Sequence, residues 1–217
     1  MKRLIRFASL FVLMFAAACA QADTQATATD SGVDGLSPAY TAGKCAIRLK
    51  LNGGTMSASA HTGSSFTSFG YYPPGTEEWS VALLCHAGES QETIDFTLHS
   101  KMVNGKWIWS DANEPFTPAQ RFKTYQIHGK NWTGRWVEYD TIYGSPDINF
   151  RKLSFCLFQT HGPQVLCGGY NGHPNAVKRT RAFNKDTKRI LNVIKTIVFV
   201  DQQAEKSSAP DMSGVAH

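Results

Sequence analysis

The sequence predicts one α+β domain, in which a curved antiparallel meander of about eight strands carries a single C-terminal helix. Three observations support this fold class. Short stretches of alternating apolar and polar residues follow one another between turn signals, only one stretch repeats its apolar residues at helical spacing, and a processed length a little under two hundred residues suits one domain. A closed barrel is the alternative, because about eight strands joined by hairpins can also close on themselves.

The first residues are typical of an export signal. Lys2, Arg3 and Arg6 give a basic start, and the apolar run that follows is too short to span a bilayer. Two cleavage positions stay open: before Cys19, which would then be lipidated as in a bacterial lipobox, or after Ala22. The chain is accordingly divided into 1–22 as signal peptide, 23–43 as disordered tether, 44–201 as globular domain and 202–217 as disordered tail.

Two segments in the first half of the domain are predicted strands with a cysteine on a core face. Residues 45–51 alternate strictly, with Cys45 on the apolar side. Residues 79–86 are apolar on both faces, as expected for a central strand that contains Cys85. Residues 55–75, which are rich in Ser, Gly and Thr, are expected to form a long loop between them.

The dipeptide Asn104-Gly105 is the strongest hairpin signal in the chain. It joins strands expected at 93–103 and 106–110 and sets Met102 opposite Trp107. The same register predicts one shared core face for Trp107, Trp109, Ile94, Phe96 and Leu98. We interpret the two tryptophans as core residues rather than as a platform for a ligand.

Strands are also expected at 122–128 and 135–143, on either side of a turn at 129–134. The second strand divides its residues between two faces, with Val137 and Tyr139 on one, and Trp136, Glu138 and Asp140 on the other. Alternating acids on an exposed strand are common, so we expect the two carboxylates to lie on a solvated surface.

Residues 151–170 form a predicted hairpin in which Cys156 faces Cys167. Pro163 has no N–H to close a two-residue loop, so a four-residue loop is expected. This register sets three further pairs opposite one another: Leu157 with Leu166, Phe158 with Val165, and Gln159 with Gln164. The cysteines then form a non-hydrogen-bonded pair, about 4.5 Å apart at Cα, which a disulfide can bridge.

One helix is expected, over 185–196, with Asn184 as its N-cap. Its apolar stripe, which must lie on the sheet, comprises Ile190, Leu191, Ile194, Ile197 and Val198. The end of this stretch, 197–200, is equally consistent with a short closing strand.

Either cleavage leaves an even set of cysteines, and the export signal places them in an oxidising compartment. We predict two disulfides, Cys45 with Cys85 and Cys156 with Cys167. No Cys/His spacing is typical of zinc, so no metal or cofactor is expected.

The motifs of common enzymes are absent from the sequence: it contains no GxSxG, HExxH, Walker or dinucleotide-binding pattern. The seven histidines have no ligand-like spacing. The sequence therefore favours a protein that is not an enzyme. The alternative, an uncharacterised hydrolase, would have to use residues such as Glu138, Asp140 or His128.

Basic residues concentrate near the C-terminus, where only Asp186 opposes them. The candidate binding residues are Lys178, Arg179, Arg181, Lys185, Lys188, Arg189 and Lys195. They are either the solvated face of a helix or a docking surface for an acidic protein or for anionic lipid. The formal charge of +5 falls to about +2 once Lys2, Arg3 and Arg6 are removed with the signal, so no nucleic-acid partner is expected.

These features favour a non-catalytic protein of the bacterial envelope that binds another protein, with an inhibitor or immunity-like role as one form of it. The alternative is a periplasmic carrier or sensor of an apolar or lipid-like ligand, suggested by thirteen Phe and five Trp. The expected location is the periplasm, either free or anchored at the outer membrane through Cys19. The biological role itself is not encoded in any motif.

Overall fold

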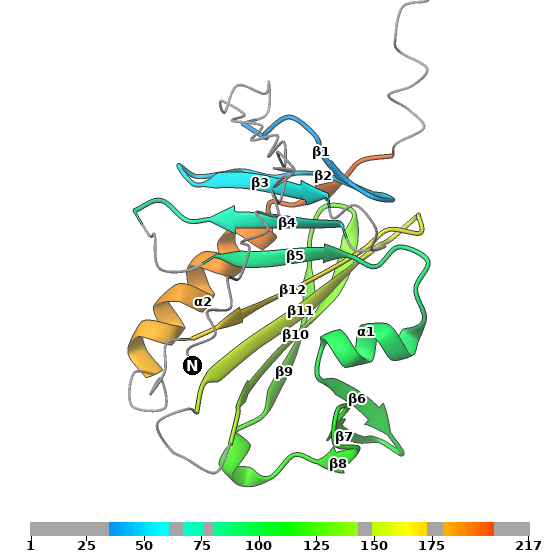
Figure 1. Cartoon of the computed structure of the whole chain (residues 1–217), viewed down its shortest axis with the longest axis vertical. Coiled ribbons are helices and arrows are strands. Elements are labelled where there is room, and N and C mark those ends of the chain that lie inside the picture. The colour runs from blue at the N-terminus through cyan, green and yellow to red at the C-terminus, as the bar shows by residue number, and fades with distance from the viewer. Residues whose placement is uncertain (1–34, 61–66, 76–79, 143–148, 173–179, 202–217) are drawn as a thin grey trace, which may run out of the picture.

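The computed structural model describes residues 35–60, 67–75, 80–142, 149–172 and 180–201. Its centre is a seven-stranded antiparallel sheet in the order β3-β4-β5-β12-β11-β10-β9, which fans out across the molecule (Figure 1). These strands are β3 (Thr55–Ala60), β4 (Thr67–Tyr72), β5 (Val81–Cys85), β9 (Lys123–His128), β10 (Trp132–Asp140), β11 (Arg151–Gln159) and β12 (Val165–Asn171). The sheet thus consists of two meanders joined where β12 pairs with β5.

Two smaller sheets flank this centre. One has the order β1-β2-β13 and contains β1 (Tyr40–Ala42), β2 (Cys45–Arg48) and β13 (Val198–Phe199). The other follows the helix α1 (Gln91–Thr97) and contains β6 (Ser100–Val103), β7 (Lys106–Trp109) and β8 (Glu114–Pro115), before the 3-10 turn η1 (Pro118–Gln120). Since β1 pairs with β2, the tether expected over 23–43 does not include residues 40–42.

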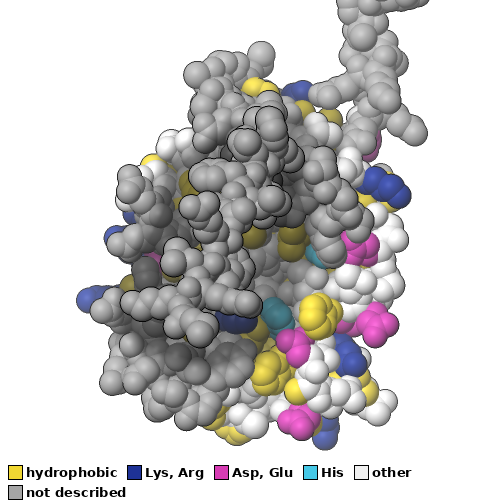
Figure 2. All heavy atoms as spheres, in the orientation of Figure 1, with side chains coloured by type: hydrophobic (Ala, Val, Ile, Leu, Met, Phe, Trp, Pro, Cys, Tyr) yellow, Lys and Arg dark blue, Asp and Glu magenta, His cyan; other side chains and the backbone are white. Residues whose placement is uncertain are grey.

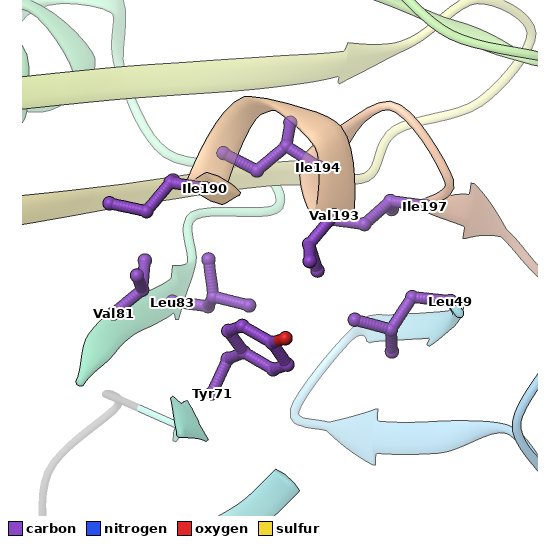
Figure 3. Close-up of a pocket in the computed structure, with 8 residues that line it drawn as sticks. All are labelled: Leu49, Tyr71, Val81, Leu83, Ile190, Val193, Ile194 and Ile197. Carbon is purple, nitrogen blue, oxygen red and sulfur yellow. The ribbon is translucent and has the colours of Figure 1, made fainter. Parts of the chain in front are cut away.

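The C-terminal helix α2 (Thr180–Ile194) covers one face of the large sheet, as the sequence predicts. It begins before the expected N-cap Asn184, which lies exposed within the helix. Figure 3 shows Val193 pointing from α2 towards Tyr71 of the sheet, and Ile190 and Ile194 line the same small space. The space left among these side chains is only about 10 Å³, so this core is filled by the protein itself.

Side chains from two turns of the large sheet form hydrogen bonds with the backbone of the short strand β13 and the residue after it. Asn131, in the turn between β9 and β10, donates from Nδ2 to the Phe199 carbonyl at 2.7 Å and accepts the Phe199 N–H at 3.1 Å. Gln164 accepts the Ala46 N–H at 2.7 Å and donates to the Val200 carbonyl at 2.8 Å. The chain end therefore joins both the small sheet and two hairpin turns.

The opposite face of the sheet has a second, smaller core beneath α1 and the β6–β8 sheet. Its buried residues are Ile94, Leu98, Val137, Tyr139, Cys156 and Cys167. Half-buried aromatic side chains, such as Phe116 and Phe122, extend it towards solvent. Figure 2 shows acidic, basic and apolar side chains mixed on the lower right, where this layer lies in Figure 1.

The predicted register of the β11–β12 hairpin is confirmed. Cys156 lies opposite Cys167, with their Cα atoms 4.0 Å apart, and the two form a disulfide. The second predicted disulfide, Cys45–Cys85, is also present and joins β2 to β5 across 5.8 Å between Cα atoms. Two disulfides indicate an oxidising, extracytoplasmic environment.

Two further segments differ from their predicted secondary structure. Residues 55–75, expected as a loop, contain β3 and β4, whose large apolar side chains Met56, Phe69 and Tyr71 are buried. The first part of the strand expected at 93–103 is helix α1, which Ser90 caps by accepting the Thr93 N–H. The hairpin that follows α1 is confirmed, with Met102 opposite Trp107.

The helix α1 also changes which side chains face the core. Ile94 and Leu98, four residues apart, are buried on one side of α1, whereas Phe96 is 61% exposed. In β7 the buried residue is Ile108, and Trp107 and Trp109 are half-buried. The core face expected to include Phe96 with both tryptophans is therefore not formed.

The closed barrel considered as an alternative is not formed by the described strands, because β3 and β9 are the two end strands of the sheet and do not pair with each other. No helix among the described residues has the length and apolarity needed to cross a membrane.

Candidate functional site

The two acids of β10 lie in a buried ion-pair network rather than on a solvated surface. Arg151 lies directly opposite Asp140 in the neighbouring strand. Its Nη1 is 2.8 Å from Asp140 Oδ1 and its Nη2 is 3.0 Å from Glu138 Oε2. Arg121 bonds the other oxygen of Asp140 through Nε. Asp140 is only 2% exposed, so the expectation of solvated acids is wrong.

The physical reason is that α2 covers this face and Arg151 provides the countercharge. A buried carboxylate requires a paired charge or several hydrogen bonds, and Arg151 supplies both with its planar fork of donors. The guanidinium group also lies over the Phe183 ring of α2, 5.4 Å from its centroid. Alternation along β10 alone does not distinguish an acid that faces water from one that faces an arginine.

Glu138 is held at both of its oxygens. Trp136 donates from Nε1 to Oε1 at 2.9 Å, while Arg151 binds Oε2. His128, the third residue named for a hydrolase, is exposed on β9 and lies on the opposite face of the sheet, where it lines a separate pocket. The structure therefore brings Glu138 and Asp140 together around arginines and leaves His128 apart from them.

A groove of about 360 Å³ opens between this network and α2; we call it the α2 groove. Its sheet side carries Tyr125 and Ile127 from β9, and Trp136 and Glu138 from β10. Trp136 is buried, whereas the Tyr125 ring is 47% exposed. Burial, and then the negative charge of Glu138, raise the pKa of Tyr125 above its ordinary value, and the charge of Arg151 partly offsets that rise. The hydroxyl is a neutral donor at neutral pH, as an ordinary phenol also is.

The helix wall of the α2 groove has four side chains at helical spacing: Asn184, Thr187, Lys188 and Leu191. Leu191 packs against the core edge, while Asn184 and Lys188 are exposed. The groove thus combines aromatic and aliphatic surface with an amide, a hydroxyl, a cation and an anion. This mixture suits a partner that offers an apolar side chain together with hydrogen-bonding groups.

The structure describes five of the seven basic residues predicted as a binding surface. Lys178 and Arg179 lie outside the described residues. The other five, Arg181, Lys185, Lys188, Arg189 and Lys195, are exposed on or just beyond α2. Among the described residues none of these five forms an ion pair. Lys188 alone lines the α2 groove.

The one acid of α2 does not offset this charge at the surface. Asp186 is 9% exposed and accepts a hydrogen bond from the buried Tyr170 hydroxyl at 3.1 Å. Burial raises the pKa of Tyr71, and the charge of Arg189 partly offsets that rise. The described solvent-facing surface of α2 therefore carries only positive charge.

A second pocket, of about 310 Å³, lies on the opposite face of the sheet; we call it the β9–β10 pocket. It is lined by Gln126, His128, Thr133, Gly134, Arg135 and Phe158. Arg135 lies over the Trp107 ring, 4.7 Å from its centroid, and its nearest carboxylate is Asp95 at 3.9 Å. Sequence reasoning missed this pocket, because the turn expected at 129–134 covers only 129–131, and Thr133 and Gly134 belong to β10.

The described residues contain no cluster of His, Cys, Asp and Glu that could hold a metal ion. Comparison of the chain with protein-family models, with characterised proteins and with solved structures finds no match.

Proposed function

We propose that the protein is a non-catalytic component of the bacterial cell envelope that binds an acidic partner protein through α2 and the α2 groove. The observation that carries this proposal is a row of exposed basic side chains on α2 with no ion-pair partner among the described residues, beside a groove with an exposed aromatic ring. Aromatic residues are enriched at protein-binding surfaces, and a positive patch complements a negative patch on its partner. An inhibitor or immunity-like role is one form such binding takes.

The chemistry of the groove supports binding over catalysis. Glu138 and Asp140 are engaged by Arg151, Arg121 and Trp136, so they serve as fixed acceptors. A general base must lie within hydrogen-bond reach of the proton that it removes, and the bonded oxygens of these two acids are directed at protein donors instead. The ion-pair network instead keeps the groove wall rigid, which lowers the cost of ordering it in a complex.

The size of the interior space favours a protein partner over an enclosed lipid-like ligand. The cavity between α2 and the sheet, about 10 Å³, accommodates at most one water molecule. Room for a ligand exists in the open α2 groove, whose rim is charged on the helix side. Such a rim complements a polar, acidic surface better than a long hydrocarbon chain.

The location we propose is the periplasm or the periplasmic side of the outer membrane. The disulfides agree with export, and the basic start with its short apolar run supports a signal peptide. Replacing Cys19 by Ser tests anchoring: secretion should continue while the protein is released from membranes. A mature N-terminus at Asp23 would contradict lipidation.

Charge reversal on α2 tests the function. Immobilised protein should retain an acidic protein from envelope extracts, and Lys185→Glu with Lys188→Glu should abolish that retention. Lys44→Glu with Lys106→Glu reverses two exposed lysines outside α2; it is the matched control and should leave retention unchanged. Retention should also weaken at high salt. Capture that ignores the α2 charges, or a lipid that copurifies in place of a protein, would overturn the proposal.

A further inference from the structure

Strand β9 presents an open edge of the large sheet, and its register shows which backbone groups face outward. The Gly129 N–H donates to the Trp132 carbonyl at 3.0 Å, which makes that pair the first hydrogen-bonded pair of the β9–β10 hairpin. Pairs alternate along an antiparallel ladder. Tyr125 and Ile127 therefore bond to β10, whereas the N–H and C=O groups of the alternate residues, Thr124, Gln126 and His128, point away from it.

These outward groups are unoccupied within the part of the chain that the structure describes: no backbone or side-chain hydrogen bond reaches them. Gln126 and His128 are exposed. The strand contains no proline, although proline is a residue that commonly blocks pairing at an edge. At the other edge of the sheet β3 lies against β1. Figure 1 shows β9 as the outermost strand on its side of the fan.

The two pockets flank this edge on opposite faces. Tyr125 and Ile127 line the α2 groove, and the alternate residues Gln126 and His128 line the β9–β10 pocket. A strand added beside β9 would direct successive side chains to opposite faces. One set would lie over the α2 groove and the other over the β9–β10 pocket. Main-chain bonds then give affinity, while pockets for alternate side chains give specificity.

We infer that β9 accepts an extended segment of the partner as an additional strand, with apolar side chains over the α2 groove and acidic side chains facing Arg135. This inference deepens the proposed function and rests on it. Ile127 and Leu191 supply the apolar surface on one face. On the other face, Arg135 has five N–H donors and its one ion pair among the described residues, with Asp95, is longer than a hydrogen bond. An acidic side chain of the added strand would accept hydrogen bonds from the Arg135 guanidinium group.

A designed peptide probes this site directly. A labelled peptide of roughly eight residues, with Leu and Glu alternating, has the required pattern, and a peptide of equal composition with Leu and Glu in separate blocks is its control. Binding is measured by fluorescence anisotropy. We expect the alternating peptide to bind at least about tenfold more tightly than the block peptide, because only the alternating peptide matches both faces.

Gln126→Pro is the variant that tests main-chain pairing. Proline lacks the outward N–H of residue 126, yet the bonds of β9 to β10 stay intact because that N–H does not take part in them. Its affinity for the alternating peptide should fall about tenfold or more. Gln126→Ala keeps the N–H and should stay within about threefold of the wild type. Equal affinities of both variants would overturn the inference.

Hydrogen exchange on the wild-type protein is a second measurement, which does not depend on the folding of a variant. The peptide should slow exchange at the amides of Thr124, Gln126 and His128, while the amides of Tyr125 and Ile127 are protected already. Peptide binding without this slowing contradicts strand addition. Protection that instead rises with protein concentration alone would identify a second copy as the occupant and would also overturn it.

The two proposals fail separately. If the peptide does not bind, but Lys185→Glu with Lys188→Glu still abolishes capture of an acidic protein, strand addition is wrong and the proposed function stands. If capture itself ignores these charges, the proposed function fails whatever the peptide does.

Discussion

The two faces of the large sheet are stabilised in different ways. Among the described residues, the core on the α2 face contains 23 buried residues, and the core on the α1 face contains 6. The α2 face also holds the buried ion-pair network of Arg151. The α1 face instead holds the Cys156–Cys167 disulfide, directly under Ile94 and Leu98. A thin layer buries too little apolar surface to fix its own geometry, and a covalent link lowers that requirement.

Aromatic contacts complete the thin layer. Phe116 and Phe122 stack with their ring centroids 4.0 Å apart, and Phe116 also meets the buried Tyr139 at 5.9 Å. Trp107 reaches Phe122 at 6.0 Å and supports Arg135 on its other side. These rings are mostly half-buried, so they link the β6–β8 sheet to β10 without a dry core. We therefore expect substitutions in the core of the α2 face to destabilise the whole domain. Substitutions in the core of the α1 face should destabilise only that layer.

The largest effect is expected at the ion-pair network. Arg151→Ala would leave Asp140 and Glu138 buried without their shared countercharge, and breaking such a pair costs about 3–5 kcal/mol of unfolding free energy. Arg121→Ala is the control, since this half-exposed arginine contacts the same Asp140, and its loss should cost less than about 1 kcal/mol. Urea unfolding of both variants measures the difference. Equal losses would show that Arg151 is not the central charge.

The next largest effect is expected from removal of the disulfides. Comparing the two losses of stability distinguishes the two faces of the sheet. In the chain-entropy description, Cys45–Cys85, with a sequence separation of 40, contributes about 4 kcal/mol. Cys156–Cys167, with a separation of 11, contributes about 3 kcal/mol. We expect Cys45→Ala with Cys85→Ala to lower the unfolding free energy more than Cys156→Ala with Cys167→Ala.

The control for this comparison is which helix becomes less protected from hydrogen exchange when a disulfide is removed. Without Cys156–Cys167, hydrogen exchange should rise in α1, because its packing partners are those sulfurs, while α2 stays protected. The β11–β12 hairpin itself is still held by Leu157 and Leu166, which belong to the other core. Faster exchange in α2 than in α1 would contradict the separation of the faces.

A smaller effect is expected where β13 joins the large sheet. Asn131→Ala removes a side chain that both donates to and accepts from the Phe199 backbone, so we expect a loss of about 2 kcal/mol. Asn192→Ala, at an exposed position of α2, is the control and should be nearly neutral. Thermal unfolding of both proteins provides the measurement. An unchanged midpoint for Asn131→Ala would show that β13 is held by β2 alone.

The fold was largely predictable because its signals are local and redundant. The β11–β12 register follows from one disulfide and one proline, and the hairpin at Asn104 follows from its turn chemistry. Helix α1 was misread because Ile94, Phe96 and Leu98 satisfy the alternation of a strand, and Ile94 and Leu98 also satisfy the four-residue spacing of a helix. The capping oxygen of Ser90 decides between them.

The candidate site was less predictable because its parts are distant in sequence. The α2 groove joins Tyr125 and Trp136 to Lys188 and Leu191, and no local pattern indicates which strands α2 will cover. The basic cluster was visible in the sequence, yet the burial of Asp186, which leaves the described surface of α2 purely positive, depends on Tyr170. The outward groups of β9 follow only from its place at the edge of the sheet.

The smallest effect concerns pH and the α2 face. Burial, and then the charge and hydrogen bond of Asp186, raise the pKa of Tyr170 above its ordinary value of 10.0, so the folded protein keeps this phenol neutral where the unfolded chain ionises it. The resulting stability is fully present below about pH 10 and is lost as the pH rises through the folded pKa. Wild-type protein should therefore lose about 1 kcal/mol between about pH 8 and about pH 11 through this group. Tyr170→Phe lacks the ionisable hydroxyl, so its urea midpoint should fall less over that range, although it begins lower because Asp186 loses a donor. Burial raises the pKa of Tyr71 as well, and a part of the alkaline slope should remain in the variant. Identical slopes for the two proteins would mean that burial and the Asp186 contact do not hold the phenol neutral.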